Sequence, residues 1–352
     1  MSDRLADHTT LRLGGPARTW VRATSEEELV AAVSEADAAG EPVLVVGGGS
    51  NLVVADEGFA GTVVEVATRG VSADVGDSDD PTCGGALVTV AAGETWDDLV
   101  ARAVERGWVG VEALSGIPGS VGATPVQNVG AYGQEVAQTI ASVRVWDRKL
   151  RGIRTFAAAD CGFGYRTSRF KVDRYDANGG RHLVLSVTFQ LRQGSLSAPV
   201  AYGELAAALG VETGQRAPLA EVRSAVLALR AGKGMVLDPA DHDTWSAGSF
   251  FTNPVVPADV VPEGAPAWPA EGGLVKTSAA WLIEHAGFGK GHGLDRDPAP
   301  VALSTKHTLA LTNRGTATAA DLLALAREVR DGVEATYGIA LVNEPVLVGC
   351  SL

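Results

Sequence analysis

The stretch LSGIPGSVGATPVQNVGAYGQEV, from Leu114 to Val136, holds five glycines where no helical or strand periodicity requires them. A glycine inside a regular element costs about 1 kcal/mol relative to alanine, so this run predicts an irregular segment with accessible backbone amides. Closely spaced N–H groups of this kind bind anions, and the pyrophosphate of a cofactor is their usual occupant. The alternative is a tight turn followed by a glycine-rich surface loop, but the length of the run favours the anion site.

A second glycine cluster, Gly47-Gly48-Gly49-Ser50-Asn51, follows the apolar run Val43 to Val46 and precedes Leu52-Val53-Val54. This pattern predicts a turn between two strands. A Rossmann fingerprint needs its glycines to open an amphipathic helix, so the spacing argues against that fold. We expect the turn amides, together with the side chains of Ser50 and Asn51, to bind phosphate as well.

The composition is that of an ordinary globular protein. The chain has 352 residues, of which 46% are apolar, enough for two or three domains with their own cores. The first residues, MSDRLADHTT, lack the features of a signal peptide, and no uncharged apolar stretch reaches about 18 residues, so we expect a cytoplasmic protein without membrane insertion. The formal charge of −13 argues against nucleic acid and anionic membranes as partners.

The three cysteines and six histidines predict neither a disulfide framework nor a metal site. Cys83, Cys161 and Cys350 are odd in number and lack CxxC spacing, so we expect free thiols. The histidines include no pair of the HExxH type, and we therefore expect no metal ligands among them.

Periodicity and capping signals predict a mixture of helices and strands. Ser25 and Glu28 form a capping box, and Thr95 is expected to cap a later helix. Helices are expected at 25–39, 95–107, 277–286 and 319–337, and strands at 43–46, 52–54, 63–67, 87–91, 142–146, 152–156 and 183–191. The acidic segment 74–85 is expected to be a solvated hairpin loop, and the prolines between 254 and 269 predict an exposed, irregular excursion.

Six segments in order carry a resemblance to a known family: VGGGSNLVV (46–54), SGIPGSVGATPVQNVGAYGQEV (115–136), FGYRTSRFK (163–171), GSFFTNP (248–254), AAWLIEHAGFGKG (279–291) and LVNEPVLVG (341–349). The chain resembles the UDP-N-acetylenolpyruvoylglucosamine reductases over almost its whole length. The resemblance implies an α+β fold with a two-part FAD-binding region of the vanillyl-alcohol-oxidase/PCMH type, followed by a C-terminal α/β substrate-binding domain. We expect FAD-binding subdomains at 1–62 and 63–235, a substrate-binding domain at 236–335, and a C-terminal segment, 336–352, that returns to the active site.

The resemblance also implies a reaction, the NADPH-dependent reduction of UDP-N-acetyl-3-O-(1-carboxyvinyl)glucosamine to UDP-N-acetylmuramate through non-covalent FAD, in peptidoglycan synthesis. An enolpyruvyl ether that accepts hydride at its methylene carbon needs stabilisation of the negative charge and a proton on the adjacent carbon. By resemblance, Ser249 donates the proton, and Arg166 and Glu344 stabilise the enol intermediate. Each has an ordinary alternative: a turn cap for Ser249, a surface ion pair for Arg166 and a structural salt bridge for Glu344.

The remaining site residues implied by the resemblance fall into two sets. The cofactor set is Val46, Gly47, Gly48, Gly49, Ser50, Asn51, Leu52, Ser115, Gly116, Ile117, Pro118, Gly119, Ser120, Val121, Gly122, Ala123, Gln127, Asn128, Gly130, Ala131, Tyr132 and Gly133. The substrate set is Tyr165, Tyr202, Arg230, Lys233, Asn253, Lys276 and His285.

Three details of the resemblance concern the substrate side. Tyr202, in AYGEL, matches the branch of the family that has a tyrosine on a longer loop. His285 stands where relatives carry an amide, and the residues between Asp238 and Trp245 look like a short addition. Both departures from the family pattern lie at the rim of the substrate site that the resemblance implies.

Two other functions remain open at this point, a flavin oxidase of the same superfamily and a nucleotide-sugar-binding regulator without catalysis. The absence of histidine and cysteine from the glycine-rich loop disfavours a covalent flavin and hence the oxidase. The presence of both Ser249 and Glu344 disfavours the regulator. We expect the protein to be a monomer.

Overall fold

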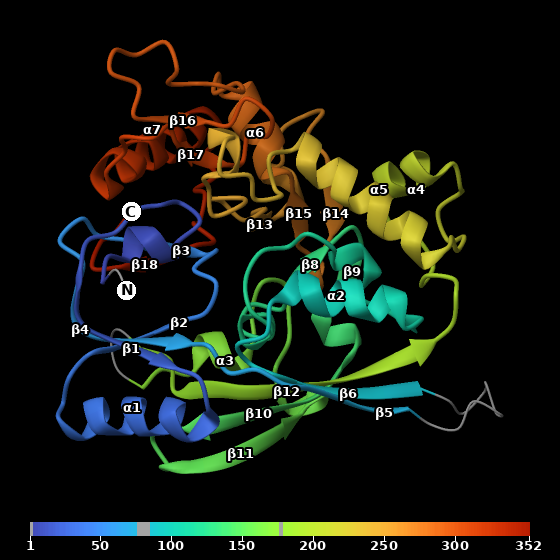
Figure 1. Ribbon diagram of the computed structural model, residues 1–352. Helices are drawn as coiled ribbons and strands as arrows, with labels where there is room; N and C mark the ends of the chain where they lie inside the picture. The colour runs from blue at the N-terminus through green and yellow to red at the C-terminus, as the bar shows by residue number, and fades with distance from the viewer. Residues whose placement is uncertain (1–2, 76–84, 176–178) are drawn as a thin grey trace. The chain divides into compact units, whose positions relative to one another are not determined.

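A computed structural model describes residues 3–75, 85–175 and 179–352 (Figure 1). The chain forms two compact units. Unit 1 holds the chain up to Ala17, Gly49–Phe59 and Gly232–Leu352, and unit 2 holds Arg18–Gly48 and Ala60–Ala231. The domain boundaries expected from the sequence remain a prediction.

The larger sheet of unit 2 has the strand order β11-β10-β12-β6-β5, and β7 also pairs with β12. Its strands are β5 (Val71–Val75), β6 (Gly85–Ala91), β7 (Trp108–Val109), β10 (Ile140–Asp147), β11 (Gly152–Ala157) and β12 (His182–Gln193), and all their pairings are antiparallel. Helix α2 (Trp96–Glu105) covers one face (Figure 1). The ring of Trp96 lies 5.9 Å from that of Phe189, between their centroids. Burial of this alternating apolar face against α2 makes the main core of the unit.

A smaller sheet of order β1-β4-β2 lies beside helix α1 (Glu26–Ala38). Its strands are β1 (Ala17–Ala23), β2 (Val43–Val46) and β4 (Phe59–Val66), with β2 and β4 parallel. The capping box of Ser25 and Glu28 begins α1 as predicted. Leu29 and Val33 then pack with apolar residues of β2, β4 and β12.

The other named strands and helices of unit 2 are short elements that lie within the glycine-rich segment or after it. These are the hairpin of β8 (Gly130–Ala131) and β9 (Gln134–Glu135), α3 (Arg169–Val172), α4 (Gly203–Leu209) and α5 (Leu219–Gly232). The last two helices pack together through Leu205, Val222 and Val226. The sequence analysis did not predict α4 or α5.

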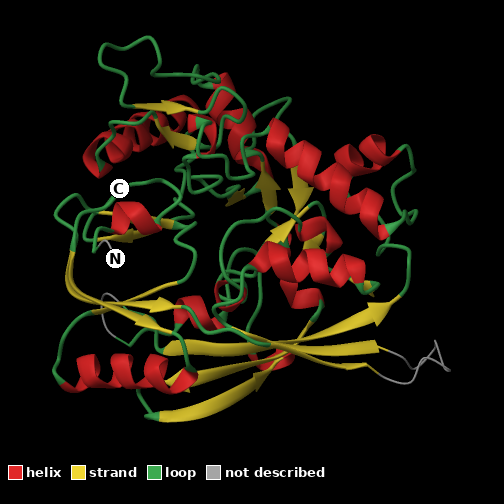
Figure 2. Ribbon diagram, in the orientation of Figure 1, coloured by secondary structure: helices red, strands yellow, loops and turns green. Residues whose placement is uncertain are grey.

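Unit 1 is built around α6 (Ala279–His285) and α7 (Ala319–Tyr337), which share a core with the hairpin of β16 (Val301–Leu303) and β17 (Leu311–Asn313) (Figure 2). Two separated parts of the chain pair in parallel, β3 (Leu52–Val54) with β18 (Val346–Val348). The proline-rich stretch contains a small antiparallel sheet of β13 (Val255–Val256), β15 (Val275–Thr277) and β14 (Ala267–Pro269).

Most predicted helices and strands are confirmed, and most of them have shifted ends. Two predictions need correction, and a third falls largely outside the described residues. Thr95 precedes α2, but its side chain makes no capping hydrogen bond. The proline-rich excursion is exposed as predicted, yet it is not wholly irregular, because its short strands pair with one another. Of the acidic segment 74–85, residues 76–84, with Cys83, lie outside the described residues, whereas Cys161 and Cys350 are free thiols.

Candidate active site

Within unit 2, Gly47 and Gly48 of the first glycine cluster lie against Gly119 and Ser120 of the second. A Cβ atom at Gly48 would lie 2.7 Å from the Cα of Gly119, and one at Gly47 would lie 2.2 Å from the Oγ of Ser120. Side chains are therefore excluded on both turns. The result is a cradle lined by main chain, which fits the pyrophosphate of a dinucleotide cofactor.

The second turn is fixed to the segment that begins α2. Gly119 accepts a hydrogen bond of 3.0 Å from the backbone N–H of Trp96. The N–H groups of Val121 and Gly122 donate to Glu94 and Ala92, each at 2.8 Å. Anchoring on both sides holds the turn rigid without using side chains, as a preorganised anion site requires.

Asp97, in the first turn of α2, connects the glycine-rich segment to α5. Its Oδ1 accepts from the Gly116 N–H at 2.6 Å, and both carboxylate oxygens accept from Arg223 at 2.7 and 2.8 Å. Burial alone would raise the pKa of Asp97, but the bonds from Arg223 and Gly116 and the charge of Arg230 outweigh it and hold the pKa below its usual value. This carboxylate is therefore ionised and bonded at neutral pH.

Arg230 is a buried guanidinium near the same cluster. Burial lowers the pKa of Arg230 to about 10, although the nearby Tyr132 and Asp97 act in the opposite direction. Tyr132 has a φ of 49° and meets the ring of Tyr202 edge-on, with 5.6 Å between centroids. Unit 2 thus brings together two predicted substrate residues, Arg230 and Tyr202, beside a predicted cofactor residue.

The turn that carries Arg166 is tied to the glycine-rich segment. Arg166 has a φ of 52°, and its Nη2 donates to the Gly130 carbonyl at 3.1 Å. Asn128, with a φ of 48°, donates from Nδ2 to the Gly164 carbonyl at 3.1 Å. Tyr165 is 41% exposed and lies with its ring 5.9 Å from the Arg166 guanidinium. Two non-glycine residues in the left-handed region mark a conformation held by these contacts.

In unit 1, the segments that carry Ser249 and Glu344 run side by side. The backbone N–H of Glu344 donates to the Phe250 carbonyl at 2.8 Å, and that of Thr252 donates to Val342 at 3.0 Å. Between these bonds, Phe251 and Asn343 form an antiparallel bridge. Phe250 and Phe251 are both 1% exposed, so their burial fixes the pairing. Ser249 and Glu344, both half-buried, stand at the same end of it.

The first glycine turn continues into this pair. The backbone carbonyl of Asn51 accepts from the Val346 N–H at 2.9 Å, and the side-chain Nδ2 of Asn51 donates to the Glu344 carbonyl at 3.4 Å. Gly49 has a φ of 59° and approaches the chain so closely that a Cβ there would lie 1.9 Å from the His8 carbonyl oxygen. The predicted phosphate-binding turn and the predicted catalytic Glu344 therefore share one backbone network.

The other predicted substrate residues of unit 1 lie around α6. Asn253 accepts the Ala279 N–H on its Oδ1 at 3.0 Å and so caps α6. His285, exposed at the end of the helix, stacks on Trp281 with 3.8 Å between ring centroids. Lys276 pairs with Val255 and Trp268 in the small sheet.

Lys233, half-buried, stands in the turn after α5. Unit 2 therefore carries Arg166, Tyr165, Tyr202 and Arg230, and unit 1 carries Ser249, Glu344, Lys233, Asn253, Lys276 and His285.

Sequence reasoning missed the residues that support the site. Asp97 looked like an ordinary acid in the first turn of a helix, and nothing in its spacing pointed to the Gly116 amide or to Arg223. In the part of the chain that the structure describes, no group of three or more His, Cys, Asp or Glu could hold a metal ion. No helix among the described residues is long and apolar enough to cross a membrane.

Two known protein families match parts of the chain, and they define the class of protein. Residues 17–150, which include both glycine clusters, match the FAD binding domain, so the chain is a flavin-binding protein. Residues 238–348, which include Ser249 and Glu344, match the C-terminal domain of UDP-N-acetylenolpyruvoylglucosamine reductase.

Relatives cover the whole chain. A UDP-N-acetylenolpyruvoylglucosamine reductase of Cutibacterium acnes is 60% identical over 348 residues, 99% of this chain and 90% of the relative. One of Thermobifida fusca is 56% identical over 361 residues, covering 99% of this chain and 97% of the relative. The chain belongs to the UDP-N-acetylenolpyruvoylglucosamine reductase family.

A solved structure of the Thermus caldophilus reductase aligns with a TM-score of 0.64 and 26% identity, over 98% of this chain and 97% of that one. The expected fold class, an FAD-binding region followed by a family-specific C-terminal domain, is confirmed.

Proposed function

We propose that this protein reduces the enolpyruvyl group of UDP-N-acetyl-3-O-(1-carboxyvinyl)glucosamine to give UDP-N-acetylmuramate, with NADPH as electron donor, in peptidoglycan synthesis. The observation that carries the proposal is the 60% identity to a reductase of this name over 99% of the chain. This reaction requires a hydride at the methylene carbon and a proton at the adjacent carbon.

The protein is an FAD-dependent oxidoreductase, and its glycine clusters fit the cofactor. Held by these clusters, FAD would supply the hydride chemistry between NADPH and the methylene carbon of the enolpyruvyl group. We assign the pyrophosphate to the cradle where Gly48 meets Gly119, because only main chain fits there. Residues 46–52 and 115–123 belong to the cofactor set in our assignment. Residues 127–133 complete the cofactor set in our assignment.

Ser249 is the proton donor in our assignment. Its position beside the buried Phe250, whose carbonyl is bonded to the Glu344 N–H, gives it a fixed backbone. A serine hydroxyl is a weak acid, so it needs hydrogen bonds or a nearby cation to stabilise the alkoxide that remains after proton transfer. We assign that support to Lys233.

Arg166 and Glu344 act on the charge that develops on the substrate. A guanidinium binds a carboxylate in a bidentate fork, so we assign Arg166 to the substrate carboxylate. Its left-handed backbone and its bond to Gly130 support a fixed orientation. We assign Glu344 to polarisation of the enol.

We assign the binding of the nucleotide sugar to the residues of the substrate set. Tyr202 covers the sugar with its exposed ring, and Arg230 and Lys233 supply positive charge for the diphosphate or NADPH. Tyr165, Asn253, Lys276 and His285 contribute further contacts. Because NADPH and UDP sugars are cytoplasmic metabolites, we place the enzyme in the cytoplasm. We propose separately that it is a monomer.

Two half-reactions followed without oxygen test this function. NADPH should bleach the yellow flavin, and the enolpyruvyl nucleotide should then restore its colour. Nicotinamide and enolpyruvate must each come within about 3.5 Å of the same flavin atom, so we expect them to bind in turn with ping-pong kinetics. A flavin that reoxidises with oxygen but not with the nucleotide would indicate an oxidase and overturn the proposal.

A further inference from the structure

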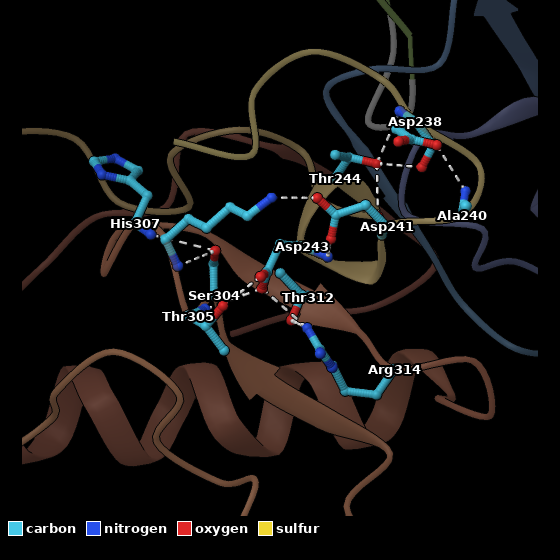
Figure 3. A network of polar contacts seen from close by, with 11 residues as sticks. Asp238, Ala240, Asp241, Asp243, Thr244, Ser304, Thr305, His307, Thr312 and Arg314 are labelled. Carbon is cyan, nitrogen blue, oxygen red and sulfur yellow. Dashed lines mark hydrogen bonds and ion pairs between the residues drawn. The ribbon is translucent and has the colours of Figure 1, made fainter. Parts of the chain in front are cut away.

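The segment between Lys233 and Ser249 is a compact polar turn that the assigned reaction does not use. It contains the 3-10 turn His242–Thr244, which Asp241 caps by accepting the Asp243 N–H (Figure 3). The Thr244 hydroxyl donates to the Asp238 carbonyl at 2.8 Å and accepts its N–H at 3.1 Å. The addition suspected from the sequence is therefore folded upon itself.

The Asp243 carboxylate is the centre of this turn. The side chain is buried, and Oδ1 accepts from the Thr305 N–H at 2.9 Å and from Arg314 Nη1 at 3.0 Å, while Oδ2 accepts the Thr305 hydroxyl (Figure 3). Burial would raise the pKa of Asp243, but the Thr305 and Ser304 bonds and the Arg314 charge hold it below its usual value. One carboxylate thus joins the turn to the loop that follows β16 and to Arg314, directly after β17.

The turn also makes contacts next to Lys233 and on the side that leads to Ser249. On the Lys233 side, a Cβ at Gly234 would lie 2.9 Å from the Asp243 carbonyl oxygen, so the two backbones are in contact. On the Ser249 side, the Trp245 carbonyl accepts from Asn313 at 3.0 Å.

Two further bonds hold the backbone before and after Ser249. The Thr10 hydroxyl donates to the Ser246 carbonyl at 2.7 Å. The Phe250 N–H, one residue beyond Ser249, donates to Leu309 at 2.7 Å. The backbone on both sides of Ser249 is therefore held from the same hairpin region and the N-terminal segment.

We propose that Asp243 is a positioning residue that holds Lys233 and Ser249 in a fixed mutual arrangement, so that the lysine supports the serine during proton transfer. The inference rests on the proposed function. Proton donation tolerates displacements of only about 0.5 Å, and a buried carboxylate with several fixed donors provides that precision. Among the described contacts, no neighbouring residue of the turn combines this burial with side-chain bonds to both Thr305 and Arg314.

The test compares Asp243→Asn with Asp241→Asn in the FAD-loaded enzyme. The amide at position 243 turns N–H groups toward Thr305 or Arg314, so the turn should shift. We expect reoxidation of the reduced flavin by the enolpyruvyl nucleotide to slow at least tenfold in Asp243→Asn, with a larger solvent deuterium effect. FAD content and reduction by NADPH should change less than twofold. Asp241→Asn keeps an Oδ1 that can cap the turn, loses the charge that pairs with Lys306 at the surface, and should behave as wild type.

A milder variant keeps the test decisive if Asp243→Asn folds poorly. Thr305→Val removes one donor of the carboxylate and should slow the same step severalfold, and hydrogen exchange of the peptide 244–250 should accelerate in the enzyme without ligands. If all steps and the thermal midpoint fall together, the role is only structural and the inference is wrong. If Ser249→Ala is itself without effect, the proton-donor assignment in the proposed function fails first, whereas a slow Ser249→Ala with a normal Asp243→Asn overturns this inference alone.

Discussion

The backbone N–H of Glu344 donates a 2.8 Å hydrogen bond to the carbonyl of Phe250, the residue that follows Ser249. The bond joins Phe250 and Glu344, which are 94 positions apart in the chain. Because Phe250 and Phe251 are buried, the pairing is fixed by core packing and not by the polar residues beside it. Ser249 and Glu344 can therefore be replaced without breaking the segment that carries them.

Ser249→Ala should separate the two half-reactions. Reduction of the flavin by NADPH needs no proton from Ser249, so its rate should stay near that of wild type. Reoxidation by the enolpyruvyl nucleotide should slow by about 10²–10⁴, the usual cost of losing a positioned general acid. Single-turnover measurements without oxygen give both rates. Thr252→Val, which removes a hydroxyl from the same segment, is the matched control, and a normal Ser249→Ala would leave Ser249 only a turn residue.

Gly48→Ala should weaken FAD binding. The new Cβ would lie 2.7 Å from the Cα of Gly119, so the two turns must move apart. Overpacking of this kind costs about 1–3 kcal/mol, which corresponds to roughly 5- to 150-fold weaker binding if it all falls on the cofactor site. Titration of the apoprotein with FAD measures the change. Gly289→Ala has open space around its Cβ and should bind FAD as wild type does.

The sequence was most informative where local chemistry determines the structure. The capping box at Ser25 predicted the start of α1, and the helical spacing of Leu322, Leu325 and Val329 predicted α7 with its observed bounds. The glycine clusters predicted main-chain surfaces, since excluded side chains leave a direct mark on composition.

Long-range contacts left no comparable signal. The meeting of Gly48 with Gly119 and the three interactions of Asp97 join segments that nothing in the sequence places together. Helix α4 has only seven residues, too few for a clear period, and α5 was missed although Leu219, Val222 and Val226 have helical spacing. The roles of Ser249 and Arg166 came from the family resemblance, since a serine after glycine and an arginine after tyrosine are common in ordinary turns.

Tyr202→Ala should weaken nucleotide-sugar binding without releasing FAD. Tyr202 is 46% exposed and contacts Tyr132 only by its ring edge, a pair worth about 0.5–1.5 kcal/mol. We expect the KM for the enolpyruvyl nucleotide to rise about tenfold or more while the flavin content stays constant. Tyr202→Phe keeps the ring and should retain most of the affinity if stacking on the sugar is its role. An apoprotein after Tyr202→Ala would place this residue in the cofactor site instead.

Asp97→Asn should remove stability at neutral pH and change its dependence on acid. The pKa of Asp97 is held below its usual value, so its ionised form contributes stability above the pKa of the unfolded chain, about 3.9, and loses it as the pH falls through the lower folded pKa. Urea unfolding at several pH values should show a gap between wild type and Asp97→Asn that is full at pH 7 and closes only below about pH 4. Because the Gly116 N–H loses a charged acceptor, FAD affinity should fall as well. Asp98→Asn, one position further along α2, is the matched control and should leave both properties nearly unchanged. A gap that is independent of pH would show that the carboxylate charge is not what holds the glycine-rich segment to α2.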